Sequence, residues 1–113
     1  MSPVIVLDKD GRFVAALGSP GGPAIISYNL KSLVGLFDWN MPLQKAVDMP
    51  NMVARGTNFS SEADRYEPGV VDGLAKLGLT IRAGSQENSG VHGVVVRNGR
   101  LEGAADPRRE GVA

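Results

Sequence analysis

The feature that most constrains this chain is a glycine- and proline-rich turn at residues 18–23, with the sequence Gly-Ser-Pro-Gly-Gly-Pro. An apolar, strand-like run ends at Leu17 and a helix-like run begins at about Ile25, so the turn joins a strand to a helix. Gly21 and Gly22 carry no Cβ, which lets the backbone bend sharply and leaves their N–H groups open to close approach. These N–H groups would lie at the positive end of the helix. The turn therefore predicts half of an anion or oxyanion site.

The other half of a catalytic site, a nucleophile and its base, is not evident in the sequence. Pro23 suits the first helical position because its missing N–H has no partner there in any helix. From the residues alone, Gly21 and Gly22 could also be a plain strand-to-helix turn. A nucleotide phosphate loop is disfavoured, since no Lys-Ser or Lys-Thr pair follows the glycines. His92 has no acid or nucleophile visibly paired with it, which favours a structural or surface histidine.

Length and composition narrow the possible classes of protein. The 113 residues suffice for a single domain spanning 1–113, and 42% of them are hydrophobic, which is enough for a packed core. Twelve basic residues balance twelve acidic ones, so no nucleic-acid partner is predicted. No apolar run approaches the roughly 18 residues of a membrane span. Without cysteine the chain has no thiolate metal site, and its one histidine disfavours zinc chemistry of the usual kind.

Residue patterns predict an α+β fold. Asp10-Gly11 and Asn98-Gly99 are typical hairpin turns, and hairpins at both ends favour antiparallel sheet(s) with helices packed on the faces. Gly78 is placed to end the third helix. The expected strands span 3–7, 12–17, 79–82, 91–97 and 100–104, and the expected helices span 23–37, 42–48 and 70–77.

Several side chains have an expected environment. The first helix should bury a stripe on the sheet, and residues 51–67 should form an irregular polar loop. Residues 85–89 read as a solvated connection. The helix stripe comprises Ile26, Leu30, Leu33, Val34 and Phe37. The aromatic side chains expected in the core or at its edge are Tyr28, Phe37 and Trp39, and the acidic side chains expected in solvent are Glu62, Asp64 and Glu67. Asp106 should form a weak surface ion pair with Arg108 and Arg109.

Five segments then stand in a distinctive order along the chain. They are Met-Ser-Pro at 1–3, Leu-Asp-Lys-Asp-Gly at 7–11, Gly-Ser-Pro-Gly-Gly at 18–22, Leu-Gln-Lys-Ala-Val-Asp at 43–48 with Pro50, and Gly-Ala-Ala-Asp-Pro-Arg-Arg at 103–109. In this order they resemble the C-terminal end of the small subunit of γ-glutamyltranspeptidases, which are N-terminal-nucleophile hydrolases. The resemblance covers most of the chain.

The resemblance implies a fold, a reaction and partners. The family fold is an αββα sandwich, and its precursors cleave themselves into a large and a small subunit. The new N-terminal threonine then attacks a γ-glutamyl amide such as that of glutathione, and the resemblance implies no cofactor and no metal. By resemblance, this nucleophile and the residues that grip the substrate lie upstream, with a Ser-Ser pair immediately before Met1. The partners implied are the upstream large subunit, the nucleophile-bearing segment and a γ-glutamyl substrate, and the compartment implied is periplasmic or secreted.

The resemblance implies a site role for few residues of this chain. The paired oxyanion-hole glycines of the family match Gly21 and Gly22. Two departures are visible: Pro23 stands where many members have Ser or Thr, and Asn51-Met52-Val53 stands where many have Arg followed by an aromatic or His run. Because the nucleophile and the substrate-gripping residues lie upstream, the chain alone is expected to be inactive. Asp106, Arg108 and Arg109 could also hold the tail against the missing subunit. The alternative hypotheses are a non-catalytic anion-binding module and a self-associating interaction module.

Overall fold

The computed structural model describes residues 2–83 and 88–113. Its larger sheet has four antiparallel strands in the order β1-β2-β6-β7. Each hairpin turn follows from local chemistry; for example, the Asp8 carboxylate accepts the N–H groups of Asp10 and Arg12 at 2.8 and 2.9 Å. The strands are β1 (Val4–Leu7), β2 (Phe13–Gly18), β6 (His92–Arg97) and β7 (Arg100–Ala105).

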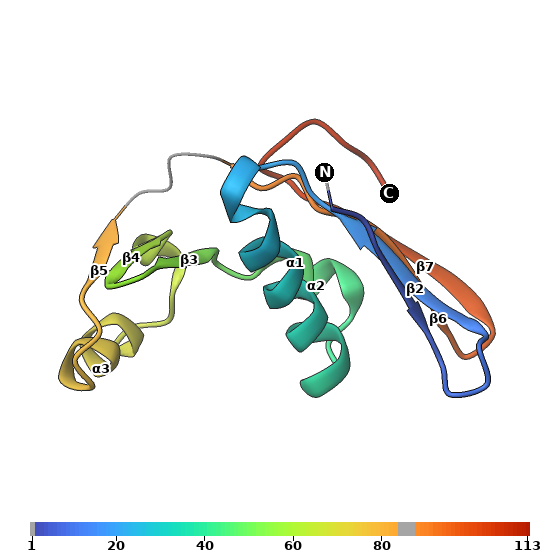
Figure 1. The fold of residues 1–113 in the computed structure, drawn as a ribbon, viewed down its shortest axis with the longest axis horizontal. Coiled ribbons are helices and arrows are strands. Elements are labelled where there is room, and N and C mark those ends of the chain that lie inside the picture. The colour runs from blue at the N-terminus through green and yellow to red at the C-terminus, as the bar shows by residue number, and fades with distance from the viewer. Residues whose placement is uncertain (1, 84–87) are drawn as a thin grey trace.

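A helical layer covers one face of this sheet (Figure 1). A short 3-10 turn (Gly22–Ala24) with Pro23 in its first positions leads into α1 (Ile25–Leu33), which continues as a π-helix (Val34–Asp38). The helix α2 (Leu43–Asp48) follows. The core between the layers is formed by alternate residues of the strands and by one face of each helix, and includes Ala15, Leu17, Tyr28, Leu36, Leu43, Val47, Val91 and Val95. The α+β prediction is confirmed.

A second, smaller lobe lies on the far side of α1 and α2 from this sheet (Figure 1). Its strands are β3 (Met52–Arg55), β4 (Asn58–Ser61) and β5 (Ile81–Ala83), with a 3-10 turn (Ala63–Arg65) and α3 (Val70–Lys76) between the last two. The prediction of an irregular loop over 51–67 is wrong, because β3 and β4 form an antiparallel hairpin there. The β4–β5 pairing is parallel. Over the described ranges, no helix has the length and apolar character to cross a membrane.

The prediction for the buried face of the first helix is wrong in part: Leu33 packs against the core as expected, but other members of the stripe do not. Ile26 and Leu30 are 74% and 59% exposed, whereas Tyr28, Asn29 and Ser32 are buried. Ser32 Oγ donates to the carbonyl of Tyr28, and Asn29 Nδ2 donates to the carbonyl of Ser2. Asn29 Oδ1 is buried and has no hydrogen-bond partner among the described residues. Of the three expected core aromatics Tyr28 is buried, whereas Phe37 and Trp39 are exposed.

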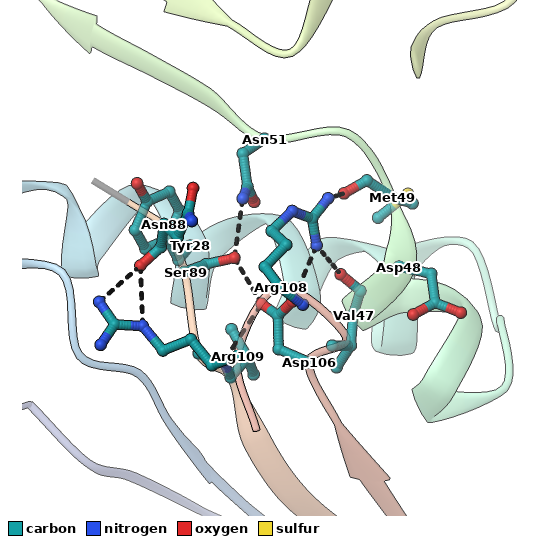
Figure 2. A network of polar contacts seen from close by, with 12 residues as sticks. Tyr28, Val47, Asp48, Met49, Asn51, Asn88, Ser89, Asp106, Arg108 and Arg109 are labelled. Carbon is teal, nitrogen blue, oxygen red and sulfur yellow. Dashed lines mark hydrogen bonds and ion pairs between the residues drawn. The ribbon is translucent and has the colours of Figure 1, made fainter. Parts of the chain in front are cut away.

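A buried ionic cluster joins the two lobes to the C-terminal segment, and Arg108 is its centre. Arg108 donates Nε to Glu62 Oε1 at 2.7 Å and Nη2 to Glu62 Oε2 at 2.6 Å. Its Nη1 donates to Asp106 Oδ1 at 3.0 Å (Figure 2). The Arg108 side chain is 7% exposed and that of Asp106 0%. The expectation of a solvated Glu62 is therefore wrong, because Arg108, 46 positions away, pairs with it inside the protein. The expected Asp106–Arg108 pair forms, but it is buried rather than on the surface.

Lys31 on α1 reinforces this cluster from the helical layer. Its Nζ donates to the carbonyl oxygens of Val47 and Met49 at 2.8 and 2.7 Å, and to Asn51 Oδ1 at 2.9 Å. Arg108 reaches the same two carbonyls at 3.4 and 3.1 Å (Figure 2). Two cations thus hold the C-terminal end of α2, where the helix dipole is negative.

Burial and charge shift the protonation of the cluster. Burial lowers the pKa of Lys31 to about 8, with the positive charge of Arg108 adding to the effect and Asp106 and Glu62 opposing it. Burial raises the pKa of Glu62, but hydrogen bonds from Arg108 and a backbone amide outweigh it, so that the pKa lies below its usual value. Glu62 and Arg108 therefore remain a charged pair at neutral pH.

Arg108→Ala should lower the free energy of unfolding by roughly 3 kcal/mol or more, because it leaves buried carboxylates without their cation. Arg100→Ala is the matched control, since Arg100 is exposed on β7. We expect the control to change stability by less than about 0.5 kcal/mol. Urea denaturation measures both; equal effects of the two substitutions would show that the cluster does not hold the lobes together.

The pKa of Lys31 predicts a stability that rises with pH on the alkaline side. The folded chain releases the Lys31 proton at about pH 8, whereas an unfolded lysine keeps it to about 10.5. Between these values the unfolded state binds more protons, so the free energy of unfolding increases with pH. Lys31→Met should flatten this increase, and Lys45→Met, at an exposed site on α2, should leave it unchanged. The free energy of unfolding is measured by denaturation at pH 7.5 and 9.5. If the Lys31→Met variant showed the same increase between these pH values as the wild type, the increase would not come from Lys31.

Candidate functional site

The turn at Gly21 and Gly22 has a backbone that only glycine adopts readily. The φ angles are 133° at Gly21 and 52° at Gly22. A Cβ at Gly21 would lie 2.6 Å from Cε2 of the buried Tyr28 ring. The sharp bend predicted from the sequence is confirmed, and the structure adds that at Gly21 the chain lies tightly against an aromatic ring of the core.

The peptide groups of the turn are used asymmetrically. The carbonyl of Gly21 accepts the N–H of Ala24 at 3.0 Å, and the carbonyl of Gly22 accepts the N–H of Ile25, so both carbonyls start the helix. Among residues 2–83 and 88–113, no acceptor takes the N–H of Gly21 or Gly22. Gly21 is buried and Gly22 exposed. Two adjacent donors at the start of a helix can hold an anionic oxygen.

A shallow hollow of about 510 Å³ lies beside the turn. It is lined mainly by apolar groups at the start of β1 and the end of β2, together with Pro20, Gly90 and His92. His92 is exposed, and its Nδ1 lies 3.1 Å from the carbonyl of Gly90. This environment agrees with the surface histidine expected from the sequence.

The sequence did not predict the roles of the polar residues beside the turn. Ser19 is fully buried, donates Oγ to the carbonyl of Pro20 at 2.7 Å and accepts the N–H of Gly90 at 3.0 Å. Ser89 is also buried, which contradicts the solvated connection predicted over 85–89; residues 85–87 of that segment lie outside the described residues. No local pattern signals a hydrogen bond between positions 71 residues apart.

Asp106 is the charged group that anchors this region. Its Oδ2 accepts the hydroxyl of Ser89 and the N–H of Val91, the latter at 3.3 Å. Burial raises the pKa of Asp106, but the hydrogen bonds from Ser89 and Arg108 outweigh it and hold the pKa below its usual value. Within the described residues, no three His, Cys, Asp or Glu side chains gather as a metal site would require.

Comparison with known proteins shows the family of the chain. A family model described as Gamma-glutamyltranspeptidase matches residues 1–113. The glutathione hydrolase proenzyme of Bacillus subtilis (strain 168) is 36% identical over 119 residues, which cover 100% of this chain and 19% of the relative. The acylase ACY 1 proenzyme of Pseudomonas sp. (strain SE83) is 31% identical over 112 residues, covering 98% and 20%.

The structural comparison extends over the whole chain. A solved γ-glutamyltranspeptidase of Pseudomonas nitroreducens, complexed with L-DON, superposes with a TM-score of 0.85 at 30% identity and covers 100% of this chain and 60% of that one. The chain spans about a fifth of the length of the curated relatives it matches. The family model, the relatives and the fold agree, and the chain belongs to the γ-glutamyltranspeptidase family.

Proposed function

We propose that this chain is the C-terminal part of a γ-glutamyltransferase or hydrolase, and that its Gly21–Gly22 turn holds the oxyanion formed when a γ-glutamyl amide is cleaved. The observation that carries the proposal is the pair of adjacent N–H groups that no acceptor takes among the described residues. Both carbonyls of the turn start the helix, so the two donors are fixed in place before a substrate arrives.

The chemistry follows from what two donors can do. A threonine hydroxyl, deprotonated by its own α-amine, attacks the amide carbonyl, and the carbonyl oxygen takes up negative charge. The N–H groups of Gly21 and Gly22 stabilise that oxygen, and one such donor typically contributes about 3 kcal/mol. The intermediate collapses to an acyl-enzyme as the amine leaves with the proton. Water or an amine acceptor then attacks the ester through a second oxyanion in the same place.

The nucleophile belongs to the part of the enzyme outside these residues. The chain holds two threonines, Thr57 and Thr80, and both are exposed on the smaller lobe. Each lies within the chain, so neither has the free α-amine that an N-terminal nucleophile uses as its base. The upstream large subunit and the nucleophile-bearing segment are therefore the partners that we propose.

The acyl group is proposed as γ-glutamyl because several relatives are named glutathione hydrolases. Another relative is named an acylase proenzyme, which supports an acyl group other than γ-glutamyl as the alternative substrate. Asn51 departs from the family pattern. Its side chain accepts a hydrogen bond from Lys31 and donates one to Ser89 inside the protein. The acceptor side of the site is where we expect this enzyme to differ from its relatives.

The isolated chain should not release p-nitroaniline from γ-glutamyl-p-nitroanilide, since an oxyanion site without a nucleophile has no intermediate to stabilise. The comparison is the precursor encoded by the reading frame upstream of Met1, which should process itself and turn over the substrate. If the isolated chain still turned over the substrate after repurification, the proposal that the nucleophile lies outside this chain would be overturned. A precursor that lacks an N-terminal-threonine segment would overturn the enzymatic proposal and favour the anion-binding module.

The isolated chain should also self-associate, because it exposes apolar side chains that the rest of the enzyme would cover. Ile5 and Leu101 are 68% and 74% exposed on strands of the larger sheet. Trp39 is 63% exposed beyond the π-helix. Sedimentation velocity should show a weight-average mass that rises with concentration. A monomer at every concentration would contradict this surface assignment.

A further inference from the structure

The turn, whose two N–H donors meet no acceptor in the described part of the chain, is supported on one side by a loop from the other end of the chain. Gly90 N–H donates to Ser19 Oγ at 3.0 Å, and the Ser19 hydroxyl donates to the carbonyl of Pro20. A Cβ on Gly90 would lie 2.9 Å from Cγ of Pro20. The loop therefore touches the two residues that immediately precede Gly21 and Gly22.

That loop is in turn fixed by the segment after β7. Asp106 N–H donates to the carbonyl of Val91 at 2.8 Å, and Asp106 Oδ2 accepts from Ser89 Oγ and the Val91 N–H. Arg109 donates Nε and Nη2 to the carbonyl of Asn88 at 3.2 and 3.0 Å (Figure 2). Asp106 and Arg109 of the tail thus hold the loop of residues 88–91 in place. We call these contacts, together with those of Ser19 and Gly90, the clamp.

The clamp is rigid because its polar atoms are buried and satisfied. Ser19, Ser89 and Asp106 are all 0% exposed. Asp106 stays charged because Arg108 donates to its Oδ1 from both its backbone N–H and its Nη1, each at 3.0 Å. Buried polar networks with every member paired define one geometry. On the opposite side, the Tyr28 ring lies against Gly21.

We propose that Ser19, Gly90 and Asp106 are positioning residues for the Gly21–Gly22 turn: the tail fixes the 88–91 loop, and the loop sets where the two N–H donors point. The inference rests on the proposed oxyanion role of the turn. None of the three residues contacts the oxyanion itself; each acts through the turn. A displacement of about 1 Å at such donors lowers the rate roughly a hundredfold, so the clamp would affect the chemical step rather than substrate binding.

Two substitutions loosen the clamp in different ways. Ser19→Ala removes the acceptor of the Gly90 N–H, and Ser19→Thr keeps the hydroxyl as the conservative rescue. Gly90→Ala inserts a methyl group against the Pro20 ring and, at 2.6 Å, against Arg109 Cδ. The matched control is Gly103→Ala on β7, where the nearest atom to a new Cβ lies 3.5 Å away.

Two measurements are made on each variant. In the enzyme that contains this chain, Ser19→Ala and Gly90→Ala should lower kcat by about tenfold or more and leave KM within about twofold, while Ser19→Thr and Gly103→Ala keep kcat within about threefold. In this chain alone, the ¹⁵N order parameters of the Gly21 and Gly22 amides should fall in the two loosened variants and not in the two controls.

The outcomes separate the inference from the function on which it rests. A wild-type enzyme that does not cleave γ-glutamyl amides refutes the proposed function, and the order parameters alone then decide whether the clamp orders the turn. Loosened variants that match Gly103→Ala in both kcat and order parameters overturn the inference. A rise in KM with kcat unchanged also overturns it, since that result assigns the loop to substrate binding. Circular dichroism confirms beforehand that each variant is folded.

Discussion

The structure depends on one buried cation. Arg108 lies where the end of β7, the end of α2 and the smaller lobe meet, and it is paired with Glu62 and Asp106. A guanidinium is suited to this position because its five donors lie in a fixed plane and can serve two carboxylates and two carbonyls together. Replacing one partner would leave the others charged and buried, so the whole cluster has to form together. The path of the tail is thereby fixed.

The fixed tail connects the core to the candidate site. Asp106 accepts from Arg108 on one oxygen and from Ser89 and Val91 on the other. The loop that contains Ser89 lies against the residues before Gly21. A bend with both φ angles positive is strained for any residue with a side chain, and here it is held between that loop and the Tyr28 ring. The donors of the turn are in this way fixed by contacts that reach across the whole chain.

Features that depend on neighbouring residues could be predicted from the sequence. The hairpin turns at Asp10-Gly11 and Asn98-Gly99, Pro23 at the start of the helix and Gly78 after α3 all follow from backbone preferences that a few residues decide. The Gly21–Gly22 bend was found for the same reason. The family, too, could be read from the order of short segments, each of them local.

Features that depend on distant partners could not be predicted. Glu62 and Arg108 are 46 positions apart, and each looks like a solvated charge until the fold brings them together. The apolar stripe of α1 reads as a buried face, yet only part of it packs against the core and the helix also buries Tyr28, Asn29 and Ser32, because two of these polar side chains find backbone acceptors there. The β3–β4 hairpin was not predicted because its second strand, Asn58–Ser61, has three polar residues out of four and is stabilised by pairing with β3 rather than by an apolar pattern.

The central claim is that the N–H groups of Gly21 and Gly22 bind the oxyanion, and replacing each N–H by an ester oxygen tests it most directly. Glycolic acid introduced at position 21 or 22 by semisynthesis removes the donor without adding a side chain, and the same replacement at the exposed Gly56 is the control. In the assembled enzyme we expect each replacement in the turn to lower kcat roughly a hundredfold with KM little changed. A kcat that matches the Gly56 control at both positions would contradict the account.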